Sequence, residues 1–137
     1  MIYKILIGFV IVMLLVIIYG RQSASYTQEP ETHNALEVEY DSIKMYALSA
    51  VRAEFGADQW IYFGDLVNRE SGWKPDAQNP TSSAMGLGQF LDSTWERVDC
   101  IKSFDPYYQI DCMVGYVALF YENPQRAIVH HNQMNWY

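Results

Sequence analysis

Residues 66–95 read LVNRESGWKPDAQNPTSSAMGLGQFLDSTW, and they join the end of a predicted helix to a long loop rich in turn formers. The helix is expected to begin near Asp58, whose side chain can cap it, and to end at Ser71, because Gly72 favours a left-handed helix terminus. The loop that follows, residues 73–85, has neither a helical nor a strand period, and long loops in compact domains are usually functional. The apolar stripe of the helix consists of Trp60, Phe63, Gly64 and Val67.

Glu70 lies near the end of this helix and borders its apolar stripe. Seven residues of helix return it to within about 20° of Phe63, at about 100° per residue. A carboxyl group flanked by Phe63 and Trp73 loses hydration, and this raises its pKa toward the value that a general acid needs near neutral pH. The alternative is a solvated glutamate at a helix end, paired with Arg69 or Lys74.

Several short motifs accompany Glu70. Glu70 and Ser71 end the helix, Trp73 and Pro75 follow it, and residues 86–89 read Gly-Leu-Gly-Gln. In this combination and order the residues resemble the signature of the lysozyme-like lytic transglycosylases, of the soluble and phage types. Each motif alone is weak, whereas the combined set is specific.

The resemblance covers residues 37–137, because the closing run 115–137 also looks like the end of such domains. It implies a lysozyme-like transglycosylase domain that is mainly α. The residues agree with this, since apolar spacings of three and four recur and no stretch alternates as a strand does. Besides the helix near Asp58, helical segments are expected at 36–55, 88–90, 92–101 and 106–121 and from Pro124 onward.

Lytic transglycosylases cleave the β-1,4 bond between N-acetylmuramic acid and N-acetylglucosamine in peptidoglycan. The resemblance implies that Glu70 protonates the leaving oxygen and then deprotonates the muramoyl 6-hydroxyl, which gives a 1,6-anhydro end. Most glycosidases use two carboxylates, but Asp65, Asp76 and Asp92 are poorly placed to be a second one beside Glu70. A mechanism with a single acid therefore suits this sequence. The alternatives are a hydrolytic muramidase of the same fold and a wall-binding structural module without turnover.

The resemblance also implies substrate-binding residues around Glu70. Ser71 is expected to orient the N-acetyl group of the sugar, with a bond to its own helix backbone as the alternative. Gln89 is expected to face the glycan, or else to complete a turn. Tyr116 is expected to point toward Glu70, or else to be ordinary core. The remaining candidates are Trp73, Gly86, His131 and Asn132.

The histidines do not form a metal site in this sequence. His131 and Asn132 stand where many members of the family carry a Tyr-Asn pair, so His131 is expected to take over a hydrogen-bonding role. His130 and His131 are about 100° apart on a helix, and His33 is distant in the chain. We therefore expect no zinc site, and the resemblance implies no cofactor.

Cys100 and Cys112 are the only cysteines. A disulfide between them closes a small loop and contributes roughly 3 kcal/mol, and it implies an exported domain. The alternative is a pair of reduced core cysteines, because no CxxC-type motif accompanies them.

The N-terminal residues 2–19, IYKILIGFVIVMLLVIIY, contain one charged side chain, Lys4. As a helix they span roughly 27 Å, close to the thickness of a bilayer core. We therefore expect a single-pass transmembrane anchor at 1–20, a tether at 21–36 and a domain on the cell-wall side. The alternative is a signal peptide that is cleaved near the small residues 23–25, although the apolar run is long for one.

The acidic composition narrows the partners. A net charge of -7 and a pI near 4.7 repel nucleic acid, while 4 Trp, 11 Tyr and 6 Phe suit stacking on sugars. The expected partners are peptidoglycan strands, the membrane and other virion or envelope-complex proteins. Small size favours a phage enzyme for genome delivery or release over a bacterial enzyme or a conjugation component.

Overall fold

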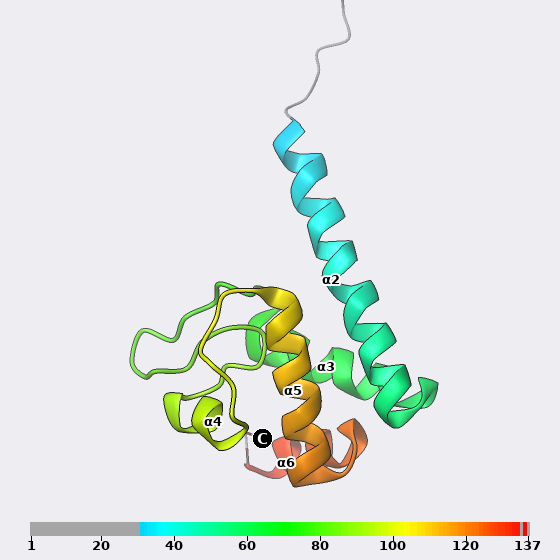
Figure 1. Ribbon diagram of the computed structural model, residues 1–137, viewed down its shortest axis with the longest axis vertical. Helices are drawn as coiled ribbons and strands as arrows, with labels where there is room; N and C mark the ends of the chain where they lie inside the picture. Colours follow the sequence, from blue (N-terminus) through cyan, green and yellow to red (C-terminus); the bar gives the residue numbers. More distant parts are fainter. Residues whose placement is uncertain (1–30, 135, 137) are drawn as a thin grey trace, which may run out of the picture. The chain divides into compact units, whose positions relative to one another are not determined.

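The computed structural model describes residues 31–134 and residue 136, and this part of the chain is mainly helical, as predicted. Within it the strand-like features are isolated bridges of Met85 with Gln78 and Phe90. One compact unit begins at Leu36. The helices are α2 (Glu31–Phe55), the 3-10 helix η1 (Ala57–Gln59), α3 (Trp60–Ser71), α4 (Asp92–Arg97), α5 (Pro106–Tyr121) and α6 (Pro124–Met134). Figure 1 labels the five α-helices.

Helix α2 corrects two predictions about the N-terminal part of the chain. Residues 31–36, assigned from the sequence to a tether, are helical. The predicted single-pass membrane localisation is contradicted, because no helix among the described residues is both long and apolar enough to cross a bilayer. α2 has 25 residues, but charged side chains such as Glu39 and Arg52 interrupt its apolar positions. The stretch 2–19, from which the anchor was predicted, lies outside the described residues.

The core forms where α3 contacts α6 and where α6 contacts α5. Full burial of a side chain the size of valine or leucine contributes about 1.5–3 kcal/mol, so α3 is firmly held at the centre of this unit. The buried apolar side chains include Ile43, Ala47 and Val51 of α2, Phe63, Leu66 and Val67 of α3, Ile110, Met113 and Val117 of α5, and Ala127 and Ile128 of α6.

Helix α3 ends as predicted but begins differently. Gly72 adopts the left-handed conformation, with φ 60° and ψ 34°, at the C-terminal cap. At the other end Asp58 lies in η1 and does not cap α3, whose N-cap is Gln59 without a side-chain cap bond. Gln59 is buried, and its Oε1 accepts a hydrogen bond of 3.1 Å from the backbone N–H of Gln125. The start of α3 is thereby tied to the start of α6.

A buried glutamine of α5 holds the loop that follows α3. Oε1 of Gln109 accepts a 2.7 Å hydrogen bond from the backbone N–H of Leu87. Its Nε2 donates to the carbonyl oxygens of Pro75, at 2.9 Å, and Ser103, at 2.8 Å. Gly86 has φ 81°, and a Cβ there would lie 2.7 Å from Oε1 of Gln109, so this close approach requires glycine.

The segment between this loop and α4 also departs from the sequence prediction. Residues 88–90 form a turn rather than a helical piece, and Gln89 has φ 48°. Met85 and Phe90 exchange two backbone hydrogen bonds of 3.2 Å, which close the turn. α4 itself ends at Arg97 instead of continuing to residue 101.

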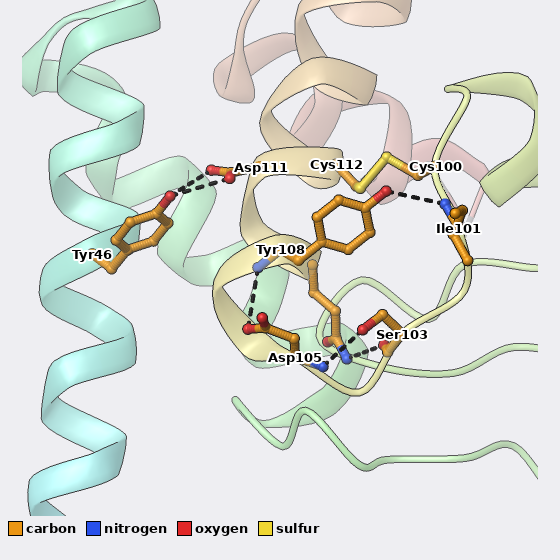
Figure 2. The surroundings of a disulfide bond; sticks show 9 residues. Tyr46, Cys100, Ile101, Ser103, Asp105, Tyr108, Asp111 and Cys112 are labelled. Carbon is orange, nitrogen blue, oxygen red and sulfur yellow. Dashed lines mark hydrogen bonds between the residues drawn. A yellow bond between two sulfur atoms is a disulfide. The ribbon is translucent and has the colours of Figure 1, made fainter.

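A disulfide joins Cys100 to Cys112 of α5 (Figure 2). The structure therefore has the oxidised pair rather than two reduced core cysteines. Beside it, the hydroxyl of Tyr108 accepts a 3.1 Å hydrogen bond from the backbone N–H of Ile101, and Asp105 caps the first turn of α5 (Figure 2). These contacts fix the connection between α4 and α5.

Candidate active site

Glu70 occupies the last turn of α3, at the edge of the core. It follows Leu66 by one turn and Phe63 by two, and both of these side chains are fully buried. The Glu70 side chain is 16% exposed, and burial raises the pKa of its carboxyl group to about 7. Burial penalises the anion, so Glu70 carries a proton in about half of the molecules near neutral pH.

His131 of α6 is the polar partner of Glu70. Its Nε2 lies 3.0 Å from Oε1 of Glu70, and its side chain is 15% exposed. Burial and the charge of Arg69 lower the pKa of His131, against an opposing effect of Asp65. Both shifts favour the uncharged form of the group, so in the molecules where Glu70 holds its proton the contact is a hydrogen bond between two neutral groups rather than an ion pair.

Glu70 lines a cleft with a volume of about 330 Å³. Ligand clefts of proteins commonly measure about 300–1,000 Å³, so this one has room for a ligand group. The turn 88–91, helices α4 and α5, and the end of the chain also contribute to it. Its other lining residues include Gly88, Gln89, Phe90, Thr94, Tyr116 and Trp136.

Ser71 ties α3 to the neighbouring turn. Its hydroxyl donates to the carbonyl oxygen of Leu87 at 2.9 Å and to that of Val67, in its own helix, at 3.3 Å. Ser71 does not line the cleft. The alternative role of a helix-end hydroxyl that bonds backbone groups describes it better than direct contact with sugar.

Gln89 lines the cleft beside Glu70. Its Nε2 donates to the carbonyl oxygens of Gly86, at 2.9 Å, and Ala77, at 3.2 Å. These two bonds fix the amide group, and its Oε1 is the atom left to accept a hydrogen bond from a ligand.

Gly86 and Trp73, both predicted to bind substrate, lie outside the described lining of the cleft. Gly86 packs against Gln109. Trp73 is only 4% exposed, and its ring centroid lies 5.8 Å from that of Trp60. Nζ of Lys44 lies 5.4 Å from the Trp73 ring on another side. Both residues therefore stabilise the fold around Glu70 and do not line the surface that a sugar would contact.

Tyr116 belongs to the core, which was one of its two predicted roles, and it also lines the Glu70 cleft. It is 5% exposed and yet lines the cleft. Its ring centroid lies 4.9 Å from that of Phe90 and 4.8 Å from that of Phe120. On a further side it packs against Tyr121, at 5.9 Å, and burial raises the pKa of the Tyr121 hydroxyl.

The aromatic wall continues into the end of the chain. The His130 ring lies 5.3 Å from the ring of Tyr121 and 4.6 Å from that of Trp136. Nδ1 of His130 is also 3.0 Å from the carbonyl oxygen of Trp136. These contacts place Trp136, which is 54% exposed, at the cleft.

Asn132 faces away from the cleft lining. Its Oδ1 accepts a 2.6 Å hydrogen bond from Nη1 of Arg69, whose Nη2 lies 2.7 Å from Asp65. These groups are exposed. The structure thus brings only the first residue of the His131-Asn132 pair to Glu70.

Glu70 is the single carboxylate among the described residues that line the cleft. Asp65 pairs with Arg69, and Asp92 pairs with Lys102 at 2.6 Å. Asp92 lies one position after the N-cap of α4, not at it, and Asp76 is exposed in the loop. In the part of the chain that the structure describes, no three potential metal ligands come together.

Several residues that line the cleft were not predicted from the sequence, among them Ser93, Arg97 and Trp136. Ser93 and Arg97, four positions apart, share one face of α4 and both line the cleft, and this spacing was a usable signal for Arg97. Trp136 had no such signal, because its position depends on contacts with His130 rather than on a local pattern.

No protein-family model, curated protein or solved structure matches this chain. The chemistry of the cleft therefore has to follow from its own residues.

Proposed function

We propose that this chain is a lysozyme-like lytic transglycosylase that cleaves the β-1,4 bond between N-acetylmuramic acid and N-acetylglucosamine. The observation that carries the proposal is the state of Glu70, a mostly buried carboxyl group in a cleft with a pKa raised to about 7. A general acid is most effective when its pKa lies near the working pH. Gln89 and Tyr116, which the family resemblance also indicated, line the same cleft.

The first step is a proton transfer from Glu70 to the glycosidic oxygen. Nε2 of neutral His131 lies 3.0 Å from Oε1 of Glu70. With its proton on Nε2 the ring donates to Oε1, which leaves the acid proton on Oε2. The bond between C1 and the leaving oxygen breaks, and the carbonyl oxygen of the substrate's N-acetyl group bonds to C1. Glu70 is then an anion, and the same N–H of His131 stabilises it.

In the second step Glu70 is the base. Its carboxylate takes the proton of the muramoyl 6-hydroxyl, O6 bonds to C1, and the bond between C1 and the N-acetyl oxygen breaks. The product carries a 1,6-anhydro ring, and Glu70 is again protonated. Supporting this route, the described lining has one carboxylate, whereas most hydrolytic glycosidases use a pair about 5–9.5 Å apart.

The other cleft residues fit sugar recognition. Oε1 of Gln89 can accept a hydrogen bond from the N–H of an N-acetyl group, because the amide is fixed by bonds to Gly86 and Ala77. The exposed ring of Trp136 offers a flat apolar face to a sugar ring.

The test is digestion of purified sacculi, followed by mass spectrometry of the soluble fragments. The parent protein should release fragments with anhydro-muramoyl ends, and Glu70→Gln should slow their release about 10³-fold, within the usual range for a lost general acid. The matched control is Asp76→Asn, which removes an exposed carboxylate of the loop and should leave the rate within about twofold.

Two results would contradict the proposal. Fragments with reducing ends would identify a hydrolytic muramidase instead. Digestion by Glu70→Gln at the rate of the parent would exclude Glu70 as the acid and with it the proposed chemistry.

A further inference from the structure

Arg97, the last residue of α4, is the one basic side chain among the described residues that line the Glu70 cleft. The whole chain has a net charge of -7, so its general field repels anions. A cation inside the cleft is therefore a local exception, and it lies where the substrate would bind.

Arg97 differs from three other basic residues in how its charge is balanced. Each of those pairs with a carboxylate: Arg69 with Asp65, Lys102 with Asp92, and Arg126 with Glu122. Within residues 31–134 and 136, no carboxylate lies within salt-bridge distance of Arg97.

The guanidinium group of Arg97 is held by an aromatic ring instead. Its Cζ lies 5.6 Å from the centroid of the Phe120 ring, a cation–π contact. A guanidinium carries five N–H donors in its plane, which matches the two oxygens of a carboxylate.

Arg97 also leaves the acid undisturbed. A nearby cation lowers the pKa of a carboxyl group, but burial alone accounts for the raised pKa of Glu70. The cleft thus holds an acid that stays protonated near pH 7 and, at another position, a cation without a carboxylate partner.

We propose that Arg97 binds a carboxylate on the side arm of the muramoyl residue and so selects muramic acid over N-acetylglucosamine. This inference rests on the proposed function of the cleft. The two sugars differ by a lactyl ether at O3, whose carboxylate is free in strands without stem peptides. In strands with stems that carboxylate is in an amide bond, and the nearest free carboxylates belong to the peptide.

The effect on affinity should be modest because Arg97 is exposed. A charge-assisted hydrogen bond at a partly solvated site is worth about 1 kcal/mol, which corresponds to a fivefold to tenfold change in affinity. Contact with an anionic group also weakens as salt is added, whereas contact with the neutral sugar backbone does not.

The experiment measures binding by the full chain carrying Glu70→Gln, so that the glycan is not consumed. Three ligands are compared: peptide-free glycan strands, strands that keep their stems, and chitohexaose, a neutral N-acetylglucosamine polymer. Arg97→Gln should raise the Kd about fivefold to tenfold for the muramoyl strands and by less than twofold for chitohexaose. The loss should shrink in about 0.5 M salt, where screening is short-ranged.

Two further variants separate this role from a structural one. Arg97→Lys keeps the charge and should recover part of the affinity for muramoyl strands. Arg126→Gln removes an equal charge from an exposed site on α6 and should change none of the three affinities. A loss confined to peptide-free strands assigns the lactyl carboxylate, and a loss confined to stem-bearing strands assigns the peptide.

An equal loss for chitohexaose and the muramoyl strands, or no loss for either kind of muramoyl strand, would overturn the role of Arg97 and leave the proposed function standing. If the protein with Arg97 intact bound no muramoyl strand at all, and the parent released no anhydro fragments, both would fall together.

Discussion

Arg69 and Glu70 are consecutive residues of α3, and each contacts one of two consecutive residues of α6. Arg69 reaches Asn132 at 2.6 Å, and Glu70 reaches His131 at 3.0 Å. The two contacts differ in their exposure to water. The Arg69 side chain is 37% exposed and that of Glu70 is 16% exposed, because a step of about 100° around a helix moves from solvent to the cleft wall.

The comparison shows that exposure to water, rather than the length of a polar contact, decides how much the contact contributes to stability and how far it shifts a pKa. Water screens the exposed pairs around Arg69, so each is worth about 0–1 kcal/mol. Around Glu70 the loss of hydration raises the pKa to about 7, and a proton becomes available for transfer. The same two helices therefore form an exposed contact at Arg69 and, at the next residue, hold the candidate acid Glu70.

The largest effect should appear in the pH dependence of glycan cleavage. In the proposed reaction Glu70 must be protonated at the start, and burial raises its pKa to about 7. Activity should therefore be present below that pH and fall about tenfold per pH unit above it, to roughly 1% near pH 9. Initial rates of sacculus digestion at limiting substrate measure this profile. If the rate instead began to fall near pH 4.5, the ordinary pKa of a glutamate, burial would not raise the pKa of Glu70.

Replacement of His131 should have the next largest effect. His131→Phe keeps a ring of similar size but removes the donor to Oε1 of Glu70, so kcat/KM should fall about 10-fold to 100-fold. The alkaline limb should also move to higher pH, because the Glu70 anion loses a hydrogen bond. His131→Tyr should recover part of the rate, since a phenol can donate in the same direction. Equal rates for His131→Phe and the parent would remove His131 from the mechanism.

Glu70 should also lower the stability of the protein at alkaline pH. Its folded pKa of about 7 exceeds the ordinary value of 4.5, so between these pH values the folded state holds a proton that the unfolded state has lost. Stability from this group therefore declines as pH rises through that window. Allowing for partial exposure, Glu70→Gln should be about 2 kcal/mol more stable than the parent at pH 8, and less so at pH 5. Urea unfolding at both pH values measures this, and no gain at pH 8 would contradict a costly buried anion.

The sequence predicted those features that depend on local signals. Gly72 ends α3, and α5 begins at Pro106 and α6 at Pro124, because glycine and proline restrict the backbone wherever they occur. The low hydration of Glu70 was also predictable, since its distance along the helix from Phe63 fixes which side it faces. The helical period predicts which side of a single helix a residue faces, but not which other helix packs against that side.

Features that depend on a second element were not predictable. The contact of Glu70 with His131 joins residues 61 positions apart, and Gln109 reaches Pro75 across 34. No local pattern encodes such pairings. Trp73 was assigned to the sugar and lies in the core against Trp60, because an aromatic residue in a loop carries no periodicity from which its direction can be read.

The smallest effect is expected at Arg69, the exposed half of the comparison. Arg69→Ala removes its contacts with Asp65 and Asn132, and it should cost less than about 1 kcal/mol of stability and change the rate at pH 7 by less than twofold. A small rise in the pKa of His131 should nevertheless be measurable. The charge of Arg69 lowers the pKa of His131 and Asp65 raises it, so the variant should protonate His131 at a slightly higher pH than the parent, and an NMR titration of the His131 ring measures this. If Arg69→Ala instead lost as much activity as His131→Phe, solvent exposure would not distinguish the two contacts, and the network between α3 and α6 would act as a unit.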